Sequence, residues 1–247
     1  MANWNDPRQT RTGFGASTVP RTGGAVTFDE GLRSYMLSIY NYMASGVLLT
    51  GIVALLTARS GLAVQFASGP LMWIVMLSPL AIVIAMSFGM NKFSRGTLQA
   101  MFWGFAVLMG LSLSTLFLIY TGASIATTFF ATAGAFAGLS LWGYTTKKDL
   151  SGFGTFLIMG VVGLVIAMVI NMFLQSSGLS LAISFLGVLI FAGLTAYDTQ
   201  KLKRIYDEVR GTEFMGKVVI MGALNLYLDF INMFLFLLRF MGVARSE

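Results

Sequence analysis

The sequence contains no cysteine and no histidine among its 247 residues. Without cysteine, disulfide frameworks, thiolate catalysis and cysteine-based metal sites are excluded. Without histidine, a response to pH near neutrality must come from carboxyl groups, or from another group whose proton affinity is perturbed by its surroundings. Charged residues make up only 11% of the chain, whereas hydrophobic residues make up 56%. This composition is typical of a polytopic membrane protein and not of a soluble domain.

The formal net charge of +6 does not indicate a nucleic-acid partner, because the basic residues form no patch with interleaved aromatic residues. Residues 1–30 are polar, rich in Gly, Thr and Arg, and contain no apolar core before a cleavage site. We therefore predict a disordered cytosolic tail over residues 1–30, and not a secretory signal peptide. Residues 31–247 are predicted to form one membrane domain.

Seven apolar runs follow the tail, each near the roughly 20 residues that a membrane-spanning helix needs. They are Ser34 to Ala58, Leu71 to Met90, Thr97 to Ile119, Ala123 to Tyr144, Phe153 to Leu174, Leu179 to Tyr197 and Val218 to Gly242. The predicted fold is an all-α bundle of seven transmembrane helices. Only Tyr120, Thr121 and Gly122 separate the third and fourth runs, which predicts a tight helical hairpin.

Lys and Arg lie mostly on one side of the predicted membrane, in the tail and in the second, fourth and sixth loops. They are Arg8, Arg11, Arg21, Arg33, Lys92, Arg95, Lys147, Lys148, Lys201, Lys203, Arg204, Arg210 and Lys217. Because basic loops face the cytosol, the N-terminus is predicted to be cytosolic and the C-terminus to lie on the opposite side.

The last run carries an acidic residue, Asp229, in its middle. On a helix, Asn225, Asp229 and Asn232 follow at i, i+4 and i+7, so they form one polar stripe. A carboxylate at membrane depth costs about 2.5 to 3.5 kcal/mol on insertion scales, and such residues face a bundle interior or a water-filled path. The stripe indicates either an ion or proton site, with the asparagines orienting Asp229, or a structural hydrogen bond between helices.

Asp198 is the other acidic residue that lies against an apolar run, at the end of the sixth one. Two carboxyl groups in contact in a low dielectric would share a proton and titrate as a coupled pair, which predicts a pH-sensitive gate. Hydropathy does not by itself place them together. Asp198 is three residues from Lys201 and Asp229 is twelve from Lys217, or about 5 and 18 Å along straight helices.

Three segments resemble the bacterial branch of the Bax inhibitor-1 family. They are NLYLDFINMFLFLLRFMG from Asn225 to Gly242, TAYDTQKLK from Thr195 to Lys203, and KKDLS from Lys147 to Ser151. The resemblance extends from about Tyr35 to Gly242. It implies a seven-helix fold in which the other six helices surround the last one. It also implies that Asp198 and Asp229 are the paired aspartates of the family.

Further roles follow from the resemblance. Lys92 corresponds to a basic residue at the cytosolic end of the second helix, a possible partner of the gate. Asn171 matches a family asparagine and, with Asn225, Asn232 and Tyr197, is a candidate for a cation path. Members are regarded as pH-sensitive calcium leak channels, and as regulators of cell survival or of membrane-protein quality control. We expect a multi-pass protein of a bacterial inner (plasma) membrane, with no resident cofactor.

The main functional hypothesis is a passive, pH-sensitive cation leak in which Asp198 and Asp229 bind Ca²⁺ transiently. Ca²⁺ takes six to eight oxygen ligands, so two aspartates would form a weak site suited to passage. The alternative is a non-transporting regulator that binds a membrane protease or another membrane protein. An intramembrane aspartyl protease is disfavoured because Leu226, Tyr227 and Leu228 precede Asp229 where such enzymes have Gly-x-Gly. The protein is not expected to be an enzyme.

Overall fold

The computed structural model describes residues 22–67 and 69–245. This part of the chain is helical apart from its turns and one isolated β-bridge, and it contains seven helices long and apolar enough to cross a membrane. The all-α, seven-span prediction is therefore confirmed. The predicted disordered tail falls mostly outside the described residues, although α1 begins at Thr22 and so enters that segment.

The helices follow the predicted runs, apart from the early start of α1 and three further differences. Their bounds are α1 (Thr22–Arg59), α2 (Leu62–Phe66), α3 (Gly69–Gly89), α4 (Arg95–Leu113), α5 (Leu116–Ile119), α6 (Gly122–Thr145), α7 (Ser151–Leu174), α8 (Ser177–Val209) and α9 (Met215–Met241). The third run is divided into α4 and α5. The short helix α2 precedes α3. Most important for the site, α8 continues beyond Tyr197, where hydropathy placed its end.

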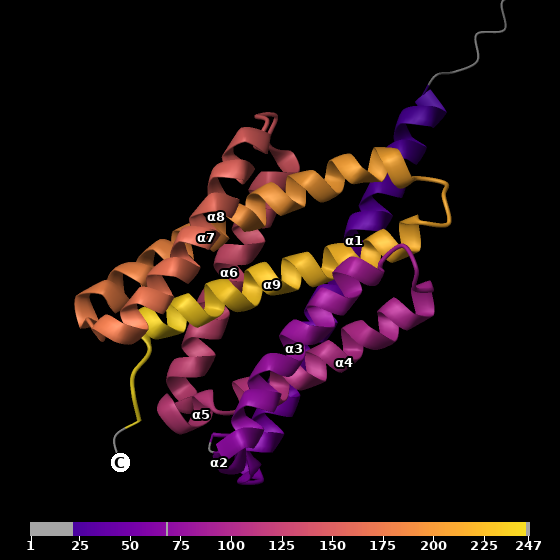
Figure 1. Ribbon diagram of the computed structural model, residues 1–247. Coiled ribbons are helices and arrows are strands. Elements are labelled where there is room, and N and C mark those ends of the chain that lie inside the picture. Colours follow the sequence, from indigo (N-terminus) through magenta and orange to yellow (C-terminus); the bar gives the residue numbers. More distant parts are fainter. Residues whose placement is uncertain (1–21, 68, 246–247) are drawn as a thin grey trace, which may run out of the picture.

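The helix α9 is the centre of the bundle. It packs against α8, α1, α6 and α4, and most of its side chains are buried. Figure 1 shows α9 between a group formed by α1, α3 and α4 and a second group formed by α6, α7 and α8. The predicted central position of the last helix is confirmed, but α3 packs mainly on α4 and α7 mainly on α8, so these two helices lie at the periphery.

The third and fourth runs do not pack together as the predicted hairpin. The connection is short, since α5 ends at Ile119 and α6 begins at Gly122, with Thr121 capping its first turn. However, α4 packs on α1 and α3, whereas α6 packs on α8 and α9. The break before α5 allows the chain to pass from one helix group to the other.

One close contact joins α9 to α1 and α4, and another joins α6 to α8, which are both neighbours of α9. Thr50 of α1 donates a hydrogen bond to the Ala106 carbonyl of α4 (2.8 Å), and its hydroxyl lies 2.7 Å from that of Tyr227 on α9. Between α6 and α8, Gly143 lies so near the Ala196 carbonyl that a Cβ there would clash with its oxygen. Small residues permit this approach of two helix backbones, which holds the second group together next to the site.

Candidate functional site

The structure brings Asp198 of α8 and Asp229 of α9 together, with their carboxyl groups close enough to interact with each other. The reason is the length of α8. Asp198 lies about 17 Å before the end of α8 at Val209, and Asp229 lies about 21 Å after the start of α9 at Met215, at 1.5 Å per residue. Because a short turn joins the two antiparallel helices, the aspartates reach similar depths. Counting from the nearest lysines along straight helices suggests that the two aspartates lie at different depths, and the structure shows that this is wrong.

The continuation of α8 is visible in its periodicity and not in its hydropathy. Leu202 and Tyr206 are buried and recur four residues apart, as expected for one face of a helix. Around them the segment is polar and charged, so a hydropathy window ends at Tyr197. The polar stretch after Asp198 is therefore a helix with a packed face.

The Asp198–Asp229 pair is largely shielded from solvent. Asp229 is only 5% exposed, and Asp198 is half-buried. No donor among the described residues reaches the buried Oδ2 atom of Asp229. A buried carboxyl oxygen without a donor is costly, so a proton held between the two carboxyl groups would supply the missing hydrogen bond.

Lys201 is the basic residue that interacts electrostatically with both aspartates. It lies one turn beyond Asp198 on α8, with its Nζ atom 5.9 Å from the centre of the Tyr197 ring. The positive charge of Lys201 attracts the ionised form of the pair. In the sequence, Lys201 indicated the orientation of the chain and the depth of Asp198, although its i+3 spacing from Asp198 already placed it on the same side of the helix.

The other residues of the predicted polar stripe do not hydrogen-bond to Asp229 in the described structure. Asn232 donates from Nδ2 to the Leu228 carbonyl of its own helix (2.8 Å), and Asn225 is half-buried. The Tyr197 ring packs against Gly154 of α7, where a Cβ would clash with the ring. Their roles in orientation or in a cation path thus stay predictions.

Comparison with known proteins identifies the relatives of this bundle. The family model described as inhibitor of apoptosis-promoting Bax1 matches residues 32–246. The chain belongs to the Bax inhibitor-1 family. It is 45% identical to the inner membrane protein YbhL of Escherichia coli K12 over 230 residues, which cover 92% of this chain and 98% of that protein. It is 47% identical to an uncharacterized protein of Rickettsia prowazekii, over 93% of this chain and 98% of the relative. The predicted family is confirmed, and the chain is a multi-pass membrane protein.

Two residues assigned by resemblance to this family lie away from the aspartate pair along the chain's helices. Asn171 is in the last turn of α7, where its Oδ1 accepts a hydrogen bond from the Ser176 backbone (3.1 Å) at the start of α8. Asp198 is about 32 Å further along α8 from Ser177. Lys92 is exposed in the turn after α3, which ends at Gly89. Lys201 acts electrostatically on the pair, and a role of Lys92 at the gate stays a prediction.

A polar clamp near Asp198 was missed from the sequence. Gln200, two residues further along α8, accepts a hydrogen bond from the Leu150 amide (2.9 Å) and donates one to the Lys148 carbonyl (2.7 Å). It thereby fixes the α6–α7 loop to α8. Hydrogen bonds of this kind depend on a loop and a helix 50 residues apart, so local sequence patterns do not reveal them.

The same loop is also held by a surface ion pair. Arg204 lies 2.9 Å from Asp149 and donates a second hydrogen bond to Ser151 (2.6 Å). Hydrogen bonds from the Ser151 side chain and backbone, together with the charge of Arg204, hold the pKa of Asp149 below its usual value. Both partners are exposed, so solvent screens this contact.

Among the described residues, no three acidic side chains come close enough to form a metal cluster. Two carboxylates alone leave most of the coordination shell of Ca²⁺ to water and neutral oxygens. The site thus consists of one buried and one half-buried aspartate, and transient cation binding by the pair stays a prediction.

Proposed function

We propose that this protein is a passive, pH-sensitive leak for cations such as Ca²⁺, gated by Asp198 and Asp229. The observation that carries the proposal is the contact of two carboxyl groups on adjacent membrane-spanning helices. Ionisable residues inside a membrane bundle are expensive and mark ion or proton paths. The electrostatic contact with Lys201 supports the same function, because it gives the ionised pair a positive partner.

The gate follows from the proton count of the pair. With one proton, the two carboxyl groups hydrogen-bond to each other and hold α8 against α9. With none, two negative charges repel at short range, and the contact either opens or takes up a cation. A cation bound by two carboxylates and water is held weakly enough to leave on the other side, as conduction requires. Flux should therefore be low when the pair is protonated and higher when it is ionised.

The test is Ca²⁺ influx into proteoliposomes that contain the purified protein, measured between pH 6 and pH 8. We expect flux to rise several-fold with pH. In Asp229→Asn the pH response should be lost, because an amide cannot ionise. Asp149→Asn is the matched control, since it removes a carboxylate that lies in an exposed loop, and it should keep the response of the wild type.

A second variant tests whether the two aspartates act together. Asp198→Asn should shift the same pH transition that Asp229→Asn abolishes, and the double variant should resemble Asp229→Asn. Two separate transitions would show that the carboxyl groups titrate independently and would refute the gate. Absence of flux at every pH would refute the leak and favour the alternative, a regulator that binds another membrane protein.

A further inference from the structure

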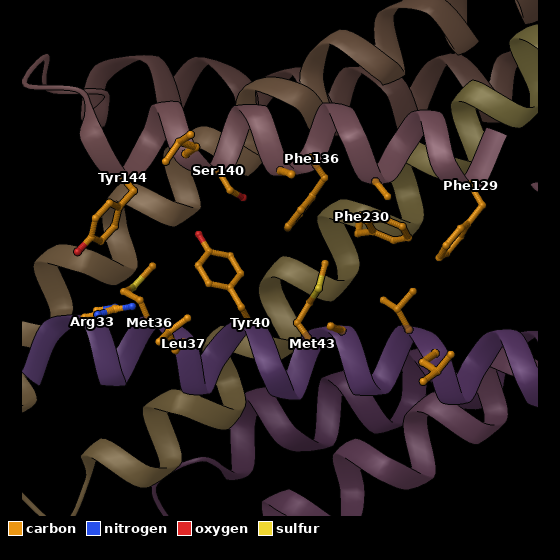
Figure 2. A pocket seen from close by; sticks show the side chains of 16 residues that line it. Arg33, Met36, Leu37, Tyr40, Met43, Phe129, Phe136, Ser140, Tyr144 and Phe230 are labelled. Carbon is orange, nitrogen blue, oxygen red and sulfur yellow. The ribbon is translucent and has the colours of Figure 1, made fainter. Parts of the chain in front are cut away.

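A long groove runs between α1 and α6, with α9 as its floor. Figure 2 shows side chains of α1 on one side and of α6 on the other, with Phe230 of α9 between them. One part of this α1–α6 groove is a cavity of about 740 Å³. It continues into a second cavity of about 460 Å³, because Val47, Leu48, Phe129 and Phe230 line both.

The groove lies at the seam between the two helix groups. On one side α1 packs on α4 and α9, and on the other α6 packs on α8 and α9. Apolar side chains along its rims are exposed: Leu37 at 49%, Leu48 at 64% and Leu141 at 64%. Since these helices span the membrane, the open side of the groove faces the hydrocarbon region of the bilayer.

Polar groups are confined to one end of the larger cavity. Arg33 and Tyr144 face each other there, and the Tyr40 and Ser140 hydroxyls lie further along (Figure 2). Towards the other end the lining is apolar, with residues such as Phe129. The groove therefore has a charged end and an apolar interior.

Arg33 lines the charged end of the groove, and a second basic residue, Lys203, lies against Tyr144. Arg33 is exposed, and no described carboxylate forms an ion pair with it. Lys203 of α8 donates a hydrogen bond to the Tyr144 carbonyl (3.0 Å), and its Nζ atom lies 5.0 Å from the centre of the Tyr144 ring. Arginine and lysine at the membrane surface attract anionic headgroups, and the arginine fork also fits a phosphate group.

The dimensions match one leaflet. Arg33 and Leu48 bound the larger cavity along α1 and are about 22 Å apart at 1.5 Å per residue. Half of a bilayer, headgroup region included, is about 20 to 22 Å thick.

We propose that the α1–α6 groove is a binding site for one anionic phospholipid, with its phosphate at Arg33 and an acyl chain along α1 and α6. Another transmembrane helix is the competing occupant. The polarity gradient and the one-leaflet length favour the lipid.

The first test is a lipid titration of the purified full-length protein in detergent, followed by native mass spectrometry. Phosphatidylglycerol is compared with phosphatidylcholine of the same chains. The wild type should bind one phosphatidylglycerol in preference. Arg33→Gln should weaken that binding roughly fivefold and remove the preference. Lys92→Gln removes an exposed charge from a turn outside the groove and should leave both unchanged. Equal effects of the two variants, or no preference in the wild type, would overturn the proposal.

The second test fills the groove. Ala137→Phe adds a ring at an exposed residue of α6 that lines the cavity, and Ala135→Phe adds the same ring at an exposed residue that does not. The first variant should lose the bound lipid and the second should keep it. Retention of the lipid in Ala137→Phe would contradict the assignment.

The third test identifies the occupant in native membranes. Because the chain has no cysteine, Ala137→Cys can be labelled alone with a benzophenone and irradiated. A lipid adduct at this site, with none of comparable yield from Ala135→Cys, supports the proposal. A protein adduct overturns it and assigns the groove to a partner helix.

Discussion

The hydroxyl contact between Thr50 and Tyr227 allows a stability prediction whose sign depends on geometry. Both residues are buried, at 2% and 0% exposure. Thr50 already donates its single hydroxyl proton to the Ala106 carbonyl. The Tyr227 hydroxyl must therefore be the donor in the 2.7 Å contact with Thr50. Removing one partner is thus not equivalent to removing the other.

Thr50→Val leaves the Tyr227 hydroxyl buried without an acceptor, and we expect it to destabilise the protein by about 1 to 3 kcal/mol. Tyr227→Phe leaves Thr50 bonded to Ala106. It should cost only about 0.6 kcal/mol, the average for an interhelical hydrogen bond in a membrane protein. The double variant no longer contains the unpaired hydroxyl, so it should be more stable than Thr50→Val alone.

The assay is reversible unfolding in mixed micelles of a denaturing and a non-denaturing detergent, with the four proteins compared as a double-mutant cycle. Thr132→Val is a suitable control, because its buried hydroxyl donates only to the Thr128 carbonyl of its own helix. It should leave no partner unsatisfied and have little effect. Additive losses for Thr50→Val and Tyr227→Phe, within about 0.5 kcal/mol, would refute the reasoning.

Three further predictions concern the packing and the loop around the site. Gly143→Ala should destabilise the α6–α8 contact by about 1 to 3 kcal/mol in the same assay, whereas Gly138→Ala, which meets no atom within 4 Å, should not. Asp149→Asn should lower the melting temperature slightly. Because the folded-state pKa of Asp149 is depressed, the stabilisation is present above its usual pKa. The difference should shrink as the pH falls below about 4 and vanish once the pH is below the lowered pKa. Gln200→Ala should speed hydrogen exchange at the Leu150 amide roughly five- to tenfold, and Gln200→Glu, which keeps the acceptor, should restore protection.

The family and the helix content were predictable from the sequence because their signals are local. Seven apolar runs of sufficient length specify seven spans, and an aspartate in the middle of one of them is conspicuous at any position of the bundle. The same applies to the last helix. Its polar stripe and its family string identified Asp229 as the residue around which a site would form.

Which residues of different helices contact each other was not predictable in this way. Hydropathy ended the sixth run at Tyr197, because it measures transfer into lipid and not helix continuity. The structure continues α8 to Val209 and so brings Asp198 level with Asp229. The contact of Lys201 with the pair and the clamp of Gln200 on its loop depend on the same continuation.

The amino-acid sequence alone determined that the chain crosses a membrane seven times and that it buries a carboxyl group, since both follow from the cost of moving each side chain out of water. Only the tertiary structure decided which groups meet there. It placed Asp198 against Asp229, and it separated α1 from α6 by a groove, because helix packing depends on shape and on contacts between segments far apart in the chain.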